Sequence, residues 1–188
     1  MAEPTLPTDR PPDDEPDAVT LRAAQRGDAS ARAAVLTLIQ DRLWRVCRGL
    51  LASDAAAEDA QQEAALRLLR GLPKFDGRSR LTTWATGIAL NVCREQRRRT
   101  MRLVQDEPAS QAFEAPPSAD AEALAALRRG LLALPQRQRE AVVLRYLEEL
   151  SVRQTAELMG VADGTVKAAV HAGLRNLRAA LGEDDARP

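Results

Sequence analysis

Apolar residues recur every three or four positions over long stretches of this chain, and that spacing places them on one face of an α-helix. Aromatic residues make up only 3% of the sequence, whereas sheets favour aromatic and β-branched side chains. The hydrophobic content of 45% is sufficient to build a core. The pattern therefore predicts an all-α protein, and its interruption predicts two small helical domains joined by a flexible linker.

The first domain is predicted over residues 18–102, as a compact helical bundle that begins with a short helix. Asp28 is expected to cap the next helix, Asp54 the one after it, and a further helix is expected to begin near Ser79. The apolar positions predicted to be buried in the first and last of these three helices are Val35, Ile39, Leu43, Val46 and Leu50, and Leu81, Trp84, Ala85, Ile88 and Val92.

The helical period lapses over residues 103–118, where prolines stand among Ser, Gln and acidic residues. This composition predicts a linker. The period resumes over residues 119–182, which we predict to be the second helical domain, with Pro135 at the start of one of its helices.

The second domain carries the spacing of a helix-turn-helix. Ser151 and Gln154 form a capping-box pattern, and Gly160 supplies a turn conformation that other residues resist. The following helix is predicted from Gly164 or Thr165, and a recognition helix of this kind lies in the major groove of DNA. Its expected buried positions are Val166, Val170, Leu174, Leu177 and Leu181, and its expected outward positions are Thr165, Lys167, Ala168, His171 and Arg175.

Charge is segregated along the chain, although the net charge is zero. Residues 1–17 carry a net charge of −5, and residues 183–188 carry −2. The rest holds 25 basic and 18 acidic side chains, a net charge of +7. A positive body with acidic ends favours a polyanionic partner, and residues 1–17 are expected to form a disordered, solvated tail.

Several classes of function are disfavoured. No apolar run approaches the ~20 residues that span a bilayer, and the N-terminus is acidic where a signal peptide is basic, so we expect a cytoplasmic protein without direct membrane insertion. Cys47 and Cys93 lie in apolar patterns and are expected to be reduced and buried. The sequence shows no phosphate-binding glycine loop, metal-ligand cluster or nucleophile–base set, so we expect no enzyme, no cofactor and no metal.

Two segments resemble a known family. The segment from Leu134 to Lys167, LPQRQREAVVLRYLEELSVRQTAELMGVADGTVK, resembles region 4 of the extracytoplasmic-function (ECF) branch of the sigma-70 family. The segment from Ser53 to Arg99 resembles region 2 of the same family. The resemblance implies an alternative sigma factor that binds core RNA polymerase, directs promoter-specific initiation and is controlled by an anti-sigma factor.

The resemblance also implies where the partners bind. In this family a D-x-x-Q-E helix docks on the clamp helices of the largest polymerase subunit, and region 4 approaches the polymerase flap. The residues implied for polymerase binding are Asp59, Gln62, Glu63, Arg67 and Arg70. The residues implied for the minus-ten promoter element are Arg78, Arg80, Asn91, Arg94, Arg97 and Arg98.

The recognition helix departs from the family pattern. Family members carry several arginines here, but this chain reads GTVKAAVHAGL and lacks basic residues at Ala169, Ala172 and Leu174. We therefore expect weak or unusual reading of the minus-thirty-five element. The residues implied for that contact are Thr165, Lys167, Ala168, His171 and Arg175.

Two other functions stay open from the sequence. A stand-alone helix-turn-helix regulator would share the second domain, although the strand patterns of a receiver or sensor domain do not occur in the first. A polymerase-binding module without promoter activity would fit the arginine-poor recognition helix.

Overall fold

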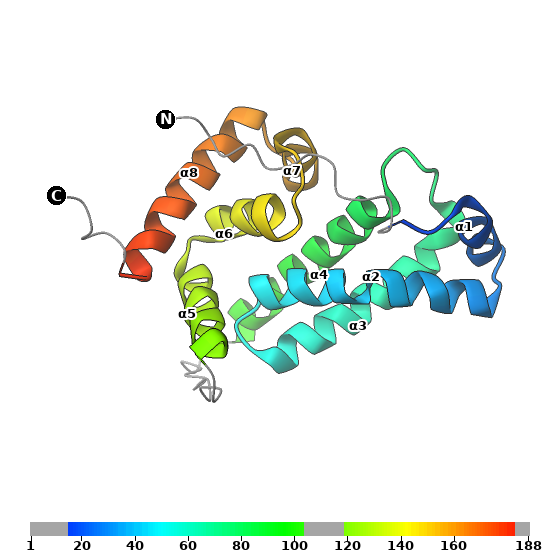
Figure 1. The fold of residues 1–188 in the computed structure, drawn as a ribbon, viewed down its shortest axis with the longest axis horizontal. Helices are drawn as coiled ribbons and strands as arrows, with labels where there is room; N and C mark the ends of the chain where they lie inside the picture. The colour runs from blue at the N-terminus through cyan, green and yellow to red at the C-terminus, as the bar shows by residue number, and fades with distance from the viewer. Residues whose placement is uncertain (1–14, 104–118, 183–188) are drawn as a thin grey trace.

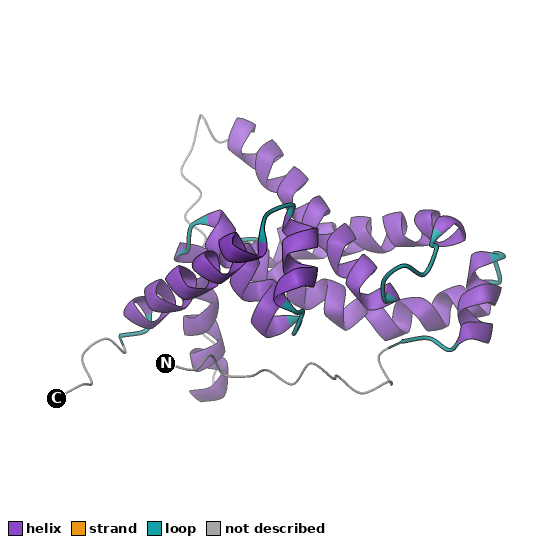
Figure 2. Cartoon of the chain, turned by 90° about the horizontal axis from the view of Figure 1, so that it is seen from above, coloured by secondary structure: helices purple, strands orange, loops and turns teal. Residues whose placement is uncertain are grey.

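The computed structural model describes residues 15–103 and 119–182, and within these ranges every regular element is helical (Figures 1 and 2). The all-α prediction is confirmed. The predicted linker lies almost wholly outside the described residues, as do residues 1–14 and 183–188.

The N-terminal half is a bundle of helices. It comprises α1 (Ala18–Gln25), α2 (Ala29–Leu50), α3 (Asp54–Gly71), a 3-10 turn (Leu72–Lys74) and α4 (Leu81–Leu103). α2, α3 and α4 pack side by side along their lengths, and α1 covers the end of α2 that lies far from the C-terminal half (Figure 1).

The helix caps show which local predictions hold. Asp28 caps α2 as predicted, and its carboxylate accepts a hydrogen bond from the Ala31 amide at 2.7 Å. The prediction that Asp54 caps α3 is wrong. Ser53 is the cap, and its hydroxyl accepts a hydrogen bond from the Ala56 amide at 3.1 Å. Asp54 is the first helical residue, where the helix dipole stabilises its negative charge.

The C-terminal half contains α5 (Ala119–Ala133), α6 (Gln136–Val142), a π-helical turn (Val143–Leu147), α7 (Val152–Met159) and α8 (Asp163–Ala180). Ser151 and Gln154 form the predicted capping box at the start of α7. Gly160 ends α7 with φ 67°, a left-handed conformation that glycine adopts without strain. α8 begins at Asp163, slightly before the predicted position.

The predicted buried stripes are confirmed in most positions. Every expected position of α2 is buried, as are Leu81, Ala85 and Val92 in α4. Trp84 and Ile88 are only half-buried, which the sequence did not predict. In α8, Leu174 is half-buried and Leu181 is 36% exposed, because Leu181 follows the last helical turn.

The two halves pack against each other. One apolar cluster contains residues of α2 and α4 together with Val143, Leu144 and Met159 from the C-terminal half. A smaller cluster of Leu131, Leu134, Val142 and Leu177 lies within the C-terminal half. α6 and the π-helical turn therefore lie directly on the N-terminal bundle (Figure 1).

Candidate nucleic-acid and protein interfaces

One face of α3 presents the polar group predicted to bind a protein partner. Asp59 and Gln62 are exposed and Glu63 is half-buried, and their spacing of three and four residues places them on one side of the helix. Asp59 and Glu63 border a hollow of about 320 Å³ between α3 and α4. Arg70 is exposed in the last turn of α3.

Arg67 has an intramolecular role that the sequence did not predict. Its Nε donates to Glu63 at 2.6 Å, and its two terminal nitrogens donate to the two Glu95 oxygens on α4, each at 2.8 Å. These bonds raise the pKa of Arg67, and the Arg67 hydrogen bonds lower the pKa of Glu95. Arg67 thus ties α3 to α4 and fixes Glu63 at the edge of the exposed face.

The loop before α4 carries the first two residues predicted to contact the minus-ten element. Arg78 is exposed and pairs with Asp76 at 3.0 Å. Phe75 closes the base of the loop, since its ring lies 5.0 Å from that of Trp84 and its carbonyl accepts a hydrogen bond from Gln25.

Arg80 is paired with a residue of the predicted tail. Its Nε lies 3.3 Å from a Glu15 carboxylate oxygen, and that carboxylate also accepts from the Leu81 and Thr82 amides at 2.9 and 3.0 Å. Glu15 therefore caps α4. Downstream of it, Asp17 caps α1, and its hydrogen bond with Thr20 lowers the pKa of Asp17.

These contacts correct the predicted tail at its inner end. Residues 1–14 lie outside the described part, but Glu15 and Asp17 satisfy helix N-termini rather than remaining solvated. The physical reason is that a helix N-terminus holds amides without helical partners, and a nearby carboxylate satisfies them.

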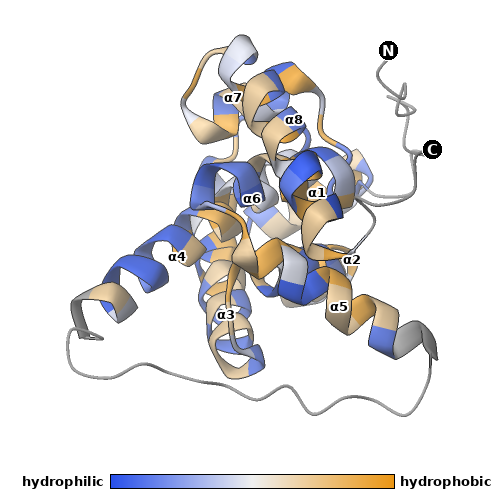
Figure 3. Cartoon of the chain, turned by 90° about the vertical axis from the view of Figure 1, so that its left-hand side faces the viewer, coloured by the Kyte–Doolittle hydropathy of each residue, from blue (hydrophilic) through white to orange (hydrophobic). Residues whose placement is uncertain are grey.

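The outer stripe of α4 forms a second hollow, of about 440 Å³, bordered by Asn91, Arg94 and Arg98. Trp84, expected to be a core residue, packs against the core and also borders this hollow, so part of its ring is accessible. Figure 3 shows the hydrophilic C-terminal half of α4 extending away from the bundle. The structure thus brings an aromatic ring, an amide and two guanidinium groups together.

Arg94 and Arg97 are not both free, exposed side chains of this hollow. Arg94 is half-buried and pairs with Glu140 of α6 at 2.7 Å. Arg97 does not border the hollow and lies within electrostatic range of Cys93 and Arg139 instead. The predicted stripe therefore contains one side chain that is already paired and one that lies outside the hollow.

Cys47 and Cys93 are free thiols, and both are buried as predicted. The hydrogen bond with Cys47 and burial raise the pKa of the Cys93 thiol, so it stays protonated at neutral pH. Their role in the structure is packing between α2 and α4.

α8 presents its predicted outward positions to solvent: Thr165, Lys167, Ala168, His171 and Arg175 are all exposed. Two positions without the expected arginine are packed, because Ala169 and Leu174 lie against the core. Of the five outward positions, only Lys167 and Arg175 carry Lys or Arg, so cationic side chains are sparse on this face of α8.

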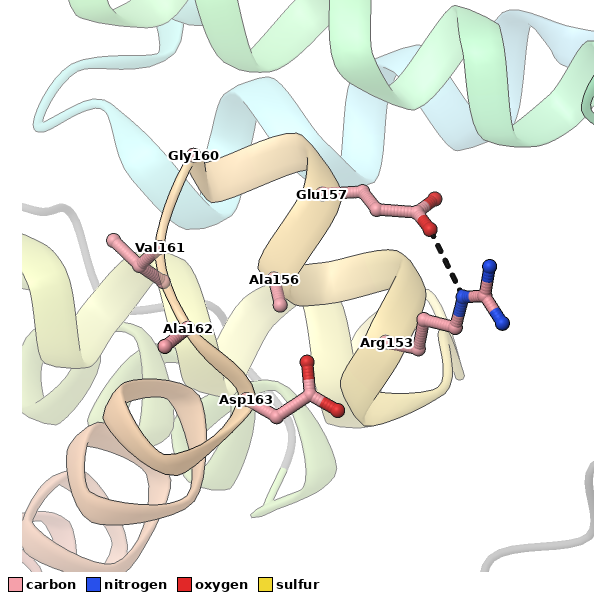
Figure 4. Close-up of a pocket in the computed structure, with 7 residues that line it drawn as sticks. All are labelled: Arg153, Ala156, Glu157, Gly160, Val161, Ala162 and Asp163. Carbon is pink, nitrogen blue, oxygen red and sulfur yellow. Dashed lines mark hydrogen bonds and ion pairs between the residues drawn. The ribbon is translucent and has the colours of Figure 1, made fainter.

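The turn between α7 and α8 contains a hollow of about 590 Å³, bordered by Arg153, Glu157 and Asp163 (Figure 4). Arg153 and Glu157 form an ion pair at 3.1 Å.

The described residues supply no evidence for a metal site or a membrane span. Within residues 15–103 and 119–182, no group of three or more His, Cys, Asp or Glu side chains is placed to hold a metal ion. In the same part of the chain, no helix has both the length and the apolar character needed to cross a bilayer.

Comparisons with known proteins agree with this geometry. Residues 36–103 match the family model of sigma-70 region 2, and residues 124–177 match that of sigma-70 region 4. The chain is 32% identical over 155 residues to the ECF RNA polymerase sigma factor SigM of Mycobacterium tuberculosis (strain ATCC 25618 / H37Rv), a match that covers 80% of this chain and 77% of SigM. The chain belongs to the ECF sigma factor family.

Other relatives extend the match to the whole fold. SigW of Bacillus subtilis (strain 168), another ECF sigma factor, is 25% identical over 86% of this chain and 94% of its own. The sigma factor RpoE, solved in complex with the anti-sigma factor NepR from Bartonella quintana, superposes with a TM-score of 0.73 at 26% identity, covering 81% of this chain and 97% of RpoE. CnrH, solved with the cytosolic domain of CnrY, shares the fold at 21% identity and a TM-score of 0.67.

The family settles the broad function that the sequence left open. An ECF sigma factor is a transcription initiation factor and not an enzyme, and the region 2 match excludes a stand-alone helix-turn-helix regulator. Hereafter region 2 denotes α2–α4 and region 4 denotes α5–α8 of this sigma factor. Sequence reasoning missed the contacts of Glu15 and Glu140, because each carboxylate meets a partner far away in the sequence.

Proposed function

We propose that this sigma factor docks on the clamp helices of the largest polymerase subunit through the outer face of α3. The observation that carries the proposal is the row formed by exposed Asp59, exposed Gln62 and half-buried Glu63, beside the hollow between α3 and α4. A row of hydrogen-bond acceptors complements a basic partner helix, because matching of opposite charges favours one orientation of the two helices when they bind. Arg67 supports the row from within by fixing Glu63, and exposed Arg70 extends the same surface.

The minus-ten element is assigned to the α4 face of region 2. Arg78 and Arg80 of the loop, Asn91, Arg94 and Arg98 of the hollow, and Arg97 farther along α4 supply cationic and polar groups for a single DNA strand. Each phosphate contact releases counterions, which favours binding at low salt. The accessible part of Trp84 offers one stacking surface for a base, and the scarcity of other aromatics predicts weaker strand opening than in housekeeping sigma factors.

The minus-thirty-five element is assigned to α8 through Thr165, Lys167, Ala168, His171 and Arg175, with region 4 near the polymerase flap. The exposed row carries few cations, and Asp163 adds a negative charge to the first turn. We expect this contact to contribute less affinity than that of region 2.

Control by an anti-sigma factor follows from the structural relative that was solved with such a partner. This partner would act in the cytoplasm, where the sigma factor meets polymerase. Co-purification from the native host in a one-to-one complex with an inhibitory protein would support this part. Recovery with core polymerase alone, without any inhibitor, would contradict it.

The docking proposal is tested by replacing Asp59, Gln62 and Glu63 with Ala and measuring binding to purified core polymerase by fluorescence anisotropy. We expect loss of binding with an unchanged circular dichroism spectrum. A matched control replaces the exposed α2 residues Gln40 and Asp41 with Ala and should bind as the wild type does. If both variants bind polymerase equally well, the docking site lies elsewhere on the protein.

A further inference from the structure

The loop before α4 is exposed over most of its length. This segment, residues 75–80 and hereafter the minus-ten loop, is exposed at every position from Asp76 to Arg80. Asp76 accepts a hydrogen bond from the Arg78 amide at 3.1 Å and pairs with the Arg78 side chain. Exposed backbone of this kind loses much conformational freedom when it becomes ordered. The contacts at the two ends of the loop therefore decide how well its shape is fixed.

Glu15 holds the end of the loop that leads into α4. Its carboxylate accepts hydrogen bonds from the Leu81 amide at 2.9 Å, from the Thr82 amide at 3.0 Å and from the Thr82 hydroxyl. The same carboxylate lies 3.3 Å from Nε of Arg80, the last residue of the loop. Thr82 is buried and Glu15 is half-buried, so these bonds are partly shielded from water, which strengthens them. One side chain thus fixes both the start of α4 and the last loop residue.

Gln25, the last residue of α1, holds the other end of the loop. Its Nε2 donates a hydrogen bond to the Phe75 carbonyl at 2.8 Å, and the Phe75 ring lies 5.0 Å from that of Trp84. The segment that leads into α1 passes beneath the minus-ten loop (Figure 1). Residues 15–25 therefore hold both ends of this loop, although they precede residues 36–103, which match the region 2 model.

Glu15 also changes the charge of the loop. Arg80 lies beside the Glu15 carboxylate, and Arg78 pairs with Asp76 at 3.0 Å. The loop and Glu15 together carry two arginines and two carboxylates, so their charges cancel. Attraction to phosphates does not depend on sequence, whereas contacts with bases do. A loop that is fixed in shape and balanced in charge is thus suited to discriminate between sequences.

We propose that Glu15 and Gln25 are positioning residues for recognition of the minus-ten element. They hold the minus-ten loop in the shape that reads the strand, and Glu15 limits the attraction of Arg80 for phosphates of any sequence. A loop that is ordered before binding lowers the conformational cost of binding. This inference rests on the proposed role of the loop and the α4 face in DNA binding, and it adds residues that act through the loop.

The first test compares two single-stranded DNAs. One strand is selected from a random pool by the full-length wild-type protein with purified core polymerase, and the other is a scrambled strand of the same composition. Glu15→Gln should lower the preference for the selected strand by about tenfold, because ordering of the loop must then accompany binding. Glu157→Gln is the matched control, because it removes the same charge from an exposed pair within α7, and it should keep the wild-type preference.

Salt dependence separates positioning from a loss of fold. Glu15→Gln frees Arg80 to contact a phosphate. For the scrambled strand, the slope of log affinity against log salt should therefore steepen by about 0.7, and the affinity at low salt should not fall. A variant that merely destabilises the fold would weaken binding of both strands equally. Equal weakening of both strands, or an unchanged preference, would overturn the proposal.

Gln25→Met tests the other end of the loop. Methionine is an unbranched residue that forms helices well, but it cannot donate to the Phe75 carbonyl. The preference for the selected strand should fall by about threefold, because one hydrogen bond to the loop is lost. The salt slope should stay at the wild-type value, because no charge is altered. An unchanged preference would contradict the role of Gln25, and a steeper slope would contradict that of the Glu15 charge.

Hydrogen exchange of the free protein measures the order of the loop without DNA. In Glu15→Gln the Leu81 and Thr82 amides lose their acceptor and should exchange faster, while amides in the middle of α2 keep their wild-type rates. Unchanged exchange at Leu81 and Thr82 would show that α4 begins at the same place without Glu15, and would contradict the proposal.

Variants of the α4 face separate failure of this inference from failure of the proposed function. If Arg98→Ala weakens binding of the selected strand but Glu15→Gln and Gln25→Met keep the wild-type preference, the minus-ten site stands and the positioning role is wrong. If selection yields no preferred sequence, or if Arg98→Ala and Asn91→Ala bind the selected strand as the wild type does, the minus-ten site itself is wrong, and the positioning role with it.

Discussion

Region 2 and region 4 each contain a helix that we propose to contact DNA, but the two helices differ in their charged side chains. The C-terminal half of α4 carries Arg94, Arg97, Arg98 and Arg99, whereas α8 offers Lys167, Arg175 and Arg178 over its whole length. The scaffold of the helix-turn-helix is nevertheless complete, from the capping box to the left-handed Gly160. The difference shows that a helix-turn-helix scaffold can persist while the outer face of its second helix carries few cations. We therefore expect region 2 to supply most of the cationic contacts to DNA.

The largest effect is expected from removing the arginines of α4, and it tests the difference between the two regions directly. Replacing Arg97 and Arg98 with Ala should weaken binding of single-stranded DNA by about 30-fold at low salt, because two phosphate contacts of about 1 kcal/mol each are lost. Replacing Lys167 and Arg175 with Ala should weaken it by less than about threefold. Anisotropy titrations at several salt concentrations measure both. Equal losses would mean that region 4 contributes as much as region 2.

Arg67 offers a comparison of stability. Arg67→Ala should lower the free energy of unfolding by about 1–2 kcal/mol, because it removes a two-point pair to Glu95 and leaves both Glu63 and Glu95 without their partner. Arg153→Ala removes one exposed pair in region 4 and should cost less than about 0.5 kcal/mol. Urea unfolding measures both, and similar losses would contradict the structural role of Arg67.

The same pair predicts a dependence on pH. The pKa of Glu95 is lowered in the folded state, so its contribution to stability is complete above the unfolded pKa and is lost as pH falls through the folded pKa. Below the ordinary glutamate range, the stability difference between the wild type and Glu95→Gln should therefore shrink. Thermal unfolding from neutral to acidic pH measures it. A constant difference would exclude this linkage.

The smallest effect is expected from adding a cation to α8. Ala168 is exposed on the helix face proposed to contact DNA, unlike the packed Ala169. Ala168→Arg should raise affinity for duplex promoter DNA by about threefold, since it adds one phosphate contact without disturbing the core. Ala179→Arg, near the far end of α8, is the control. If Ala168→Arg does not raise the affinity, DNA contacts another part of region 4.

The sequence predicted those features whose causes act within one or two helical turns. The capping box at Ser151, the cap at Asp28 and the turn at Gly160 each depend on neighbouring residues, and all are present. The cap of α3 was misplaced by one residue, because Ser53 and Asp54 are both good capping side chains. Local chemistry thus predicts elements reliably and exact boundaries less so.

The contacts between domains could not be predicted in this way. Arg94 and Glu140 are 46 residues apart, and Arg42 and Glu148 are 106 apart, so no local spacing indicates that they pair. The half-buried state of Trp84 is likewise set by the tertiary arrangement, since its position on the helical stripe predicts burial. For the same reason the sequence placed Asn91, Arg94 and Arg98 on one stripe of α4, where they border one hollow, but did not indicate that Arg94 pairs with Glu140.

The most direct test of the central claim is run-off transcription with purified core polymerase across a genomic promoter library. We predict promoter-specific products with the wild type, most of them retained by the Lys167→Ala/Arg175→Ala variant, and none with Arg97→Ala/Arg98→Ala. Products lost with the region 4 variant and retained with the region 2 variant would contradict the account.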